Sequence, residues 1–157
     1  MNLSALLAKH YREVVFGGNW TDVDLKAKLE GVDWKLATTQ VHSLNTIAAL
    51  VYHINYYVRA VIGVMENKPL TSSDKYAFNL PSIQSEKDWE DLKAAAWNDS
   101  QRFIGLLEQF PESRLHETMA DEKYGSWYRN IQGIIEHTHY HLGQISLIRK
   151  IIENRKS

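Results

Sequence analysis

Three histidines lie within five residues near the C-terminal end of the chain, in a stretch whose apolar spacing predicts a helix. They are His137, His139 and His141. Each residue of an α-helix turns about 100° around the axis, so His137 and His141 lie about 40° apart on one face. His139 is rotated about 200° from His137, and we expect it at the surface or in a subunit contact. Because imidazole is a common metal ligand, this pair of histidines predicts one bound ion, although two core histidines that bind no metal have the same spacing.

A metal site in a helical bundle draws its ligands from facing helices, so a third ligand must come from elsewhere in the chain. The candidates are His10, His42, His53 and His116. If the bundle is up-down-up-down, the second and fourth long helices run the same way, and His53 and His137 each lie about ten residues, about 15 Å, past their helix starts. This depth favours His53, with His10 in reserve.

Two further side chains are expected close to the histidines. Gln144 lies about 20° from His137 on the same face and could hydrogen-bond a ligand imidazole or a water. Tyr57, four residues after His53, either faces the same cavity or supplies a structural hydroxyl at the bundle surface. Glu136 points about 100° away from His137, so no carboxylate shares the histidine face and the catalytic residues stay unknown. Three protein ligands leave a position for water or substrate, as in catalytic zinc sites.

The composition limits the class of protein. The chain has 157 residues, the size of one domain, and we expect a single domain over residues 1–157. Its 18 Lys and Arg residues balance 19 Asp and Glu residues, so the basic surface of a nucleic-acid-binding protein is missing. The absence of cysteine excludes disulfides, a thiolate nucleophile and cysteine-ligated zinc.

The apolar segments bear on location. Residues 1–7 lack the basic leader of a secretory signal, and we find no apolar run that approaches the roughly 20 residues of a membrane span. We therefore expect a cytoplasmic protein that binds neither nucleic acid nor a membrane.

Four long segments carry apolar residues at helical spacing. They are residues 2–16, 43–68, 85–110 and 131–152. The Val and Ile content of the second segment also allows a strand, but an apolar period near 3.6 sustained over about twenty residues favours a helix. With no convincing strand elsewhere, these amphipathic segments predict an all-α four-helix bundle around one core.

Capping residues and loops complete this outline. Ser43 is the natural N-cap of the second long helix. In the broken pattern before it, Thr21 or Asp22 could cap one short helix and Asp33 another. Residues 68–85 form a loop longer than a compact bundle needs, and long loops often cover sites.

The histidine-bearing segments resemble those of a known family. Residues 136–145, Glu-His-Thr-His-Tyr-His-Leu-Gly-Gln-Ile, are similar to the C-terminal His-x-x-x-His-x-Gly-Gln signature of the DinB-like (DinB/YfiT) superfamily of metal-dependent proteins. Residues 43–54, Ser-Leu-Asn-Thr-Ile-Ala-Ala-Leu-Val-Tyr-His-Ile, are similar to that family's second-helix pattern, in which a Ser-led helix reaches a ligand histidine. The likeness covers nearly the whole chain.

The resemblance implies a four-helix bundle with a long crossover between helices two and three. It also implies a site for a divalent metal, zinc or nickel before iron or manganese, carried by His53, His137 and His141. Relatives include bacillithiol S-transferases and mycothiol-dependent isomerases, and many are dimers, so the resemblance implies a homodimer and a small-molecule substrate such as a low-molecular-weight thiol. The chain departs from the family at Leu142, where many relatives carry Arg, so recognition of an anion or thiol through that position does not carry over.

Three functions follow as hypotheses. The first is an enzyme with thiol S-transferase or hydrolase chemistry, in which the ion lowers the pKa of water or of a thiol cosubstrate. The second is a non-catalytic, stress-related dimeric module that binds a metal or captures a ligand. In the third, the histidines bind no metal.

Overall fold

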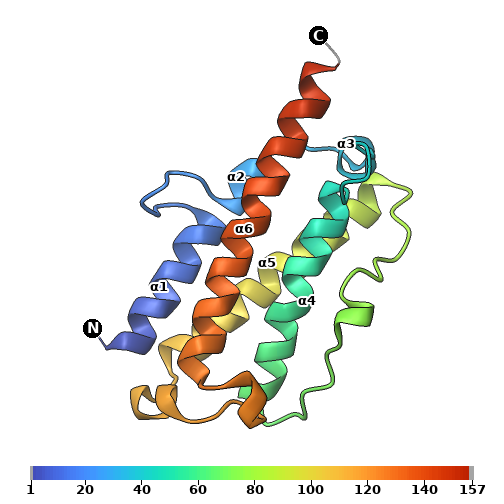
Figure 1. Ribbon diagram of the computed structural model, residues 1–157. Helices are drawn as coiled ribbons and strands as arrows, with labels where there is room; N and C mark the ends of the chain where they lie inside the picture. Colours follow the sequence, from blue (N-terminus) through green and yellow to red (C-terminus); the bar gives the residue numbers. More distant parts are fainter. Residues whose placement is uncertain (1, 156–157) are drawn as a thin grey trace.

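Four long helices form a bundle in the computed structural model, which describes residues 2–155 (Figure 1). They are α1 (Leu3–Phe16), α4 (Ile47–Met65), α5 (Glu86–Glu108) and α6 (Trp127–Asn154). The short helices α2 (Leu25–Leu29) and α3 (Trp34–Thr38) lie between α1 and α4, and three 3-10 helices lie in the later loops: Asp74–Tyr76, Glu112–His116 and Glu122–Tyr124. Residues 2–155 contain no strand beyond one isolated bridge. The prediction of an all-α bundle is confirmed.

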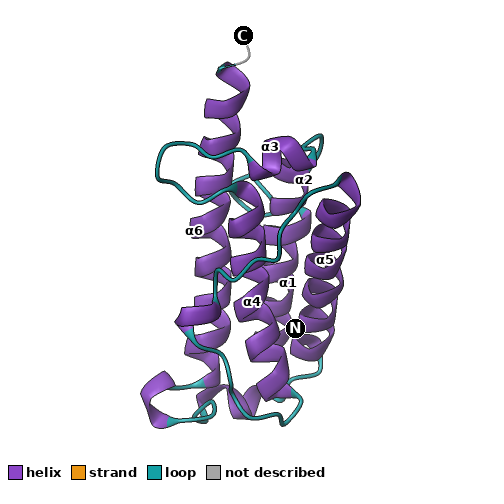
Figure 2. Ribbon diagram, turned by 90° about the vertical axis from the view of Figure 1, so that its right-hand side faces the viewer, coloured by secondary structure: helices purple, strands orange, loops and turns teal. Residues whose placement is uncertain are grey.

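The helices do not alternate in direction. Helices α1 and α6 run one way, and α4 and α5 run the other way (Figure 1). Contacts agree, because Asn55 of α4 donates to Asp99 of α5, while Glu66 at the end of α4 pairs with Arg102 further along α5. The up-down-up-down arrangement that the comparison of helix depths assumed is therefore wrong, whereas the long crossover that the family resemblance implies is present. Two neighbouring parallel helices need a connection that returns along the bundle, and residues 66–85 form this long crossover (Figure 2).

Two of the predicted caps are displaced. Helix α4 begins at Ile47, and its N-cap is Thr46, whose hydroxyl accepts a hydrogen bond from the Ala49 amide at 3.2 Å. Ser43 stays in the turn before the helix, where the neighbouring His42 has a positive φ of 49°. An N-cap is the residue directly before the first helical one, so Thr46 takes this role and Ser43 lies three residues too early.

The predicted N-cap is wrong for one of the two short helices and right for the other. Neither Thr21 nor Asp22 caps α2, because Asp24 does so through a 2.8 Å hydrogen bond from the Ala27 amide. Asp33 caps α3 as predicted. Helix α2 packs on α1 and α6, and α3 packs on α4 and α5, so together they cover the end of the bundle where α6 finishes.

The core divides into two apolar clusters at different heights. One cluster takes α4 side chains up to Ile54 and α6 side chains from Leu142 onward, together with α2, α3 and Trp89 of α5. The other takes α4 from Val58 and α6 up to Ile135, together with α1 and α5 from Phe103 onward. Between the clusters lie the buried polar residues His53, Asn55, Thr138 and His141. The seam between two cores is thus where the bundle carries its polar groups.

Helix α4 corrects one sequence expectation. The helix has 19 residues, and an 18-residue window of it has a mean hydropathy of 1.3, which by length and composition is enough to cross a membrane, although we expected no such run. More than half of that window, 56%, is buried inside the bundle. Its apolar side chains belong to both core clusters, as those of a buried helix do.

The core predicts the effect of one pair of substitutions. Leu107 of α5 is fully buried, and Leu107→Ala should lower the free energy of unfolding by about 2–5 kcal/mol because it leaves a cavity. The matched control is Leu147→Ala, at a side chain that is 58% exposed, and it should change that free energy by less than about 0.5 kcal/mol. Urea unfolding followed by circular dichroism measures both. Equal losses in the two variants would contradict this assignment of the core.

Candidate metal centre

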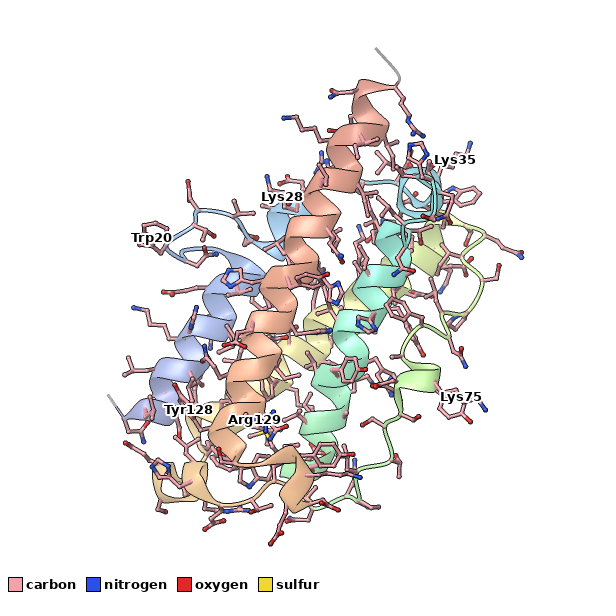
Figure 3. All side chains as sticks on the ribbon, in the orientation of Figure 1. Trp20, Lys28, Lys35, Lys75, Tyr128 and Arg129 are labelled. Carbon is pink, nitrogen blue, oxygen red and sulfur yellow. The ribbon has the colours of Figure 1, made fainter. Side chains whose placement is uncertain are left out.

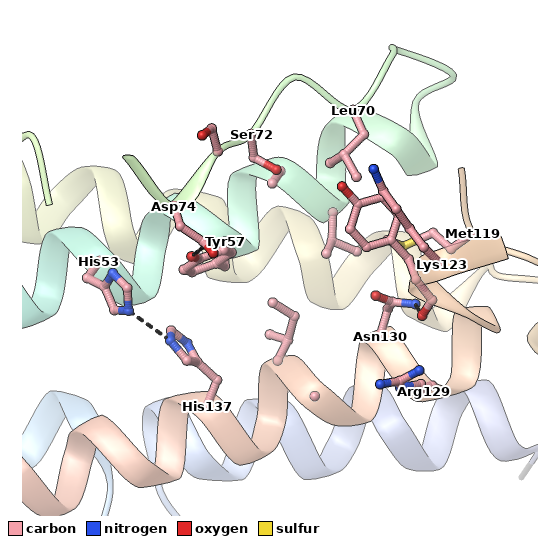
Figure 4. Close-up of a pocket in the computed structure, with 16 residues that line it drawn as sticks. His53, Tyr57, Leu70, Ser72, Asp74, Met119, Lys123, Arg129, Asn130 and His137 are labelled. Carbon is pink, nitrogen blue, oxygen red and sulfur yellow. Dashed lines mark hydrogen bonds between the residues drawn. The ribbon is translucent and has the colours of Figure 1, made fainter. Parts of the chain in front are cut away.

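Three imidazoles meet in the seam between the two core clusters. His53 comes from α4, and His137 and His141 come from α6 one turn apart. The Nε2 atom of His137 lies 3.0 Å from Nε2 of His53 and 3.0 Å from Nε2 of His141. One nitrogen of each ring lies within 4.8 Å of the others, so the group could hold a metal ion. The structure brings together the three histidines that the sequence selected (Figure 4 shows two of them).

The helix directions explain why these residues meet. His53 lies six residues after the first residue of α4 and twelve before Met65, its last residue. His137 lies ten residues after Trp127, the first residue of α6. Because α4 and α6 run in opposite directions, the end of α4 is level with the start of α6. The sequence argument for His53 assumed a wrong helix start and a wrong direction. The residue is level with His137 because it lies about as far from the end of α4 as His137 lies from the start of α6.

Hydrogen bonds fix which nitrogen of two rings carries the proton. Nδ1–H of His53 donates to the Ala77 carbonyl at 3.1 Å, and Nδ1–H of His141 donates to Oε1 of Gln144 at 2.6 Å. A neutral imidazole has one N–H, so Nε2 of both rings carries a lone pair. These two lone pairs face Nε2 of His137, which has one proton at most. Protons alone therefore cannot satisfy all three nitrogens.

A cation would satisfy them. Zinc binds histidine nitrogen at about 2.0–2.1 Å, which places tetrahedral ligand nitrogens about 3.3 Å apart. Two of the three pairs here are 3.0 Å apart, close to that value, and all three nitrogens lie within 4.8 Å of one another. Metal-bound histidines in proteins donate their other N–H to a carbonyl, a carboxylate or a water, as His53 and His141 do to Ala77 and Gln144. Nδ1 of His137 is buried with no partner in the described chain. The donor set and its supporting contacts therefore fit a divalent ion such as zinc or nickel.

The electrostatic environment keeps the rings neutral. Burial, together with the neighbouring His141 and His53, lowers the pKa of His137 to about 4. Burial also lowers the pKa of His53 and of His141. The hydrogen bond that each ring makes raises its pKa, but burial has the larger effect. Neutral imidazole is the form that binds a metal, so at neutral pH the site needs no proton release from these rings.

The crossover supplies contacts that the sequence did not reveal. Ala77 is buried and gives its carbonyl to His53, and the ring of Phe78 stacks on the His53 ring at 3.9 Å between centroids and 9° between planes. Asp74 accepts a 2.5 Å hydrogen bond from the Tyr57 hydroxyl. The length of the loop was the one sequence feature that pointed to such contacts. The residue types in the loop do not indicate which side chains they contact. Residues 74–78 act as a strap over His53.

The two predicted supporting residues both lie beside the histidines. Gln144 accepts from His141 through Oε1 and donates through its amide to the Tyr140 hydroxyl at 3.3 Å. Tyr57 lies edge-on to His53 and His137, with ring centroids 5.2 and 5.1 Å away. Burial, together with the Asp74 carboxylate, raises the pKa of Tyr57 to about 12, so this hydroxyl keeps its proton at neutral pH.

The other histidines lie elsewhere. His139 points to a different side of α6, where its ring centroid is 6.2 Å from that of His10 of α1. His42 contacts Arg155, and His116 is exposed in a 3-10 helix. None of these four side chains joins the three-histidine group.

A cavity of about 670 Å³ opens beside His53 and His137 (Figure 4). Its walls come from α4, from the start of α6, from the crossover and from the loop before α6. This volume lies in the range of small-molecule sites. Asp74 is the one carboxylate among the described residues that line it, so the crossover brings an acid that the α6 pattern did not offer.

Comparison with known proteins gives one match. A family model described as the DinB superfamily matches residues 19–145, a range that runs from the link after α1 to Ile145 of α6 and includes all three histidines and Gln144. No curated protein and no solved structure matches the chain.

The lowered histidine pKa values predict how stability depends on pH. Between pH 6.5 and pH 4 the unfolded chain binds more protons than the folded one at His137, so the stability present above pH 6.5 is lost as the pH falls. We expect metal-free wild type to lose about 1 kcal/mol more than His137→Gln between pH 7 and pH 4.5, after allowance for solvent screening. Urea unfolding at each pH measures this.

The control for that experiment is His116→Gln, which removes an exposed histidine outside the cluster and should keep the pH dependence of the wild type. The same pH dependence in all three proteins would show that His137 is not desolvated.

Proposed function

The chain belongs to the DinB superfamily, and from this membership and the histidine geometry we propose that it is a divalent-metal-dependent enzyme acting on a small molecule. His53, His137 and His141 hold the ion through Nε2. The observation that carries the proposal is the meeting of two fixed lone pairs on a third imidazole that has one proton at most. A buried arrangement of this kind is unfavourable without a cation.

The chemistry proposed is thiol S-transfer or hydrolysis, and zinc or nickel is the ion that the imidazole set suits. When bound, such an ion lowers the pKa of a water or a thiol and makes it a nucleophile at neutral pH. In S-transfer the sulfur forms a bond to an electrophilic carbon, and the leaving group departs with its bonding electrons.

The side chains around the histidines have separate roles in this proposal. Ala77 and Gln144 hold two rings so that Nε2 points inward, and Phe78 keeps water from one face of His53. Asp74 lines the cavity beside them and is the candidate acceptor for the proton that the thiol or water loses. Tyr57 holds the Asp74 carboxylate in place through its hydroxyl.

One observation favours a second candidate, a module that binds a metal or captures a ligand without turnover. Asp74 already accepts a hydrogen bond from Tyr57, whose raised pKa keeps that proton on the hydroxyl. The carboxylate oxygen that accepts this hydrogen bond is therefore already occupied and is less available to take a proton from a nucleophile. A homodimer and a cytoplasmic location are part of both candidates.

Metal analysis tests the proposal. Protein purified without nickel affinity resin, stripped with a chelator and reloaded with zinc should hold one ion per chain. His53→Gln and His141→Gln should each weaken zinc binding by at least about 100-fold, because loss of a ligand exceeds the 10–100-fold typical of losing a supporting contact. His139→Gln, from the same helix but outside the cluster, is the control and should bind zinc as the wild type does.

Equal zinc content in all four proteins would contradict both candidates. To separate the two, the reloaded wild type and Asp74→Asn are assayed with thiols and electrophiles. Metal-dependent turnover that falls in Asp74→Asn supports the enzyme, whereas tight retention of a thiol without any product supports the binding module.

A further inference from the structure

The cavity beside the histidines has two chemically different ends. One end is formed by His53, His137, Tyr57 and Asp74. At the other end, Lys123 and Arg129 line the wall, and Figure 4 shows them well away from the two histidines. Lys123 belongs to the loop before α6, and Arg129 to the first turn of α6 (Figure 3). The site proposed above uses neither cation.

Neither cation has an ion-pair partner among the residues that the structure describes. Within residues 2–155, no carboxylate lies within 4.0 Å of the Lys123 ammonium or of the Arg129 guanidinium, although nine other ion pairs occur. Asp74, the carboxylate of the cavity, lies at the histidine end, where it binds Tyr57. Because the histidines are neutral, the charged side chains lining the cavity sum to a positive charge, and an ion at the histidines would increase it.

Local contacts hold both cations at the wall. The Lys123 ammonium lies over the Tyr124 ring, 4.9 Å from its centroid. The Arg129 stem lies over Gly125, where an added Cβ would come within 3.2 Å of Cδ and where φ is 74°. Asn130 donates to the carbonyls of Tyr124 and Ser126, which ties the loop to the start of α6. The two side chains therefore project from an ordered loop and helix junction.

The spacing along α6 sets the length of a ligand that reaches both ends. Arg129 and His137 are eight residues apart, which corresponds to about 12 Å along the helix axis. A single carboxylate or phosphate cannot span that distance. A molecule with a metal-binding atom at one end and an anionic group several bonds away can do so.

We propose that Lys123 and Arg129 form an anion subsite, and that the substrate is an elongated small molecule with a donor atom at the histidine end and a carboxylate or phosphate at the other. An arginine guanidinium binds a carboxylate or a phosphate through two parallel N–H donors, and a lysine ammonium adds a positive point charge. The inference rests on the proposed function, because it takes the three histidines as the metal end of the same cavity.

Four thiols, chosen for length and charge, test the subsite. Zinc-loaded protein is titrated calorimetrically with mercaptooctanoic acid and mercaptooctanol, each with the thiol on its terminal carbon, and with the short pair mercaptopropionic acid and mercaptopropanol. Wild type should bind the long acid about 10-fold more tightly than the long alcohol, as a charge-assisted hydrogen bond at an accessible site gives. The short pair should show no such difference, since its carboxylate cannot reach Arg129. A fifth ligand, mercaptooctyl phosphate, distinguishes phosphate from carboxylate. Tighter binding than that of the long acid indicates that the subsite prefers a phosphate, and weaker binding indicates a carboxylate.

The double variant Lys123→Gln/Arg129→Gln should lose the preference for the long acid and keep its affinity for the long alcohol. The control is Lys28→Gln/Lys150→Gln, which also removes two positive charges, one from a half-buried and one from an exposed side chain, and neither side chain lines the cavity. Lys28 lies on α2, far along the bundle from Arg129 (Figure 3). This control should keep the preference, and thermal unfolding verifies that both double variants are folded.

The outcomes separate the subsite from the function on which it rests. Equal binding of the long acid and the long alcohol by zinc-loaded wild type overturns the subsite and leaves the metal site standing. Loss of the preference in the control as well as in the cavity variant also overturns it, because net charge would then be the cause. Failure of every thiol to bind, with no zinc retained, overturns the proposed function and the subsite together.

Discussion

The convergence of three imidazole nitrogens that share at most one proton is the constraint on which the rest of the site depends. Two of the rings keep an Nε2 lone pair pointing inward because the opposite side of each ring has an acceptor for its Nδ1 proton. A backbone carbonyl of the crossover provides it for His53, and a side-chain amide one turn along α6 provides it for His141. Burial then keeps all three rings neutral by lowering each pKa. The geometry and the protonation state thus have a common cause in the packing around the rings.

This constraint accounts for the topology of the bundle around it. Parallel neighbours α4 and α5 require a connection that returns along the whole bundle, and such a connection can cross one face at the height of the histidines. The crossover uses that position, because residues 74–78 contact both His53 and Tyr57. The division of the core into two apolar clusters leaves a layer between them where polar side chains can be buried with partners. A single continuous core would leave no such layer.

The sequence predicted the elements better than their junctions. Amphipathic periodicity located all four long helices because each must bury one face, and this requirement acts along the whole segment. Caps depend on a single backbone turn, so Asp33 was placed correctly while Thr46 and Asp24 displaced equally suitable neighbours.

The site followed the same rule. The pair in α6 was predictable because both residues share one helix, and Gln144 for the same reason. Ala77 was not predictable, because it contributes a backbone carbonyl and every residue has one. Its contact with His53 depends on the course of the crossover in the folded protein. Arg129 and Lys123 were missed because the cavity wall that they form is built from a loop of unknown course.

The order of the three histidines along the chain determines when the site can form during synthesis. His53 and His137 are separated by 84 positions, so α6 leaves the ribosome long after α4. A nascent chain that already displays α4 has no partner for its histidine until α6 has been made. An ion held by all three histidines is then acquired only after α6 has been synthesised, from among the ions present at that time.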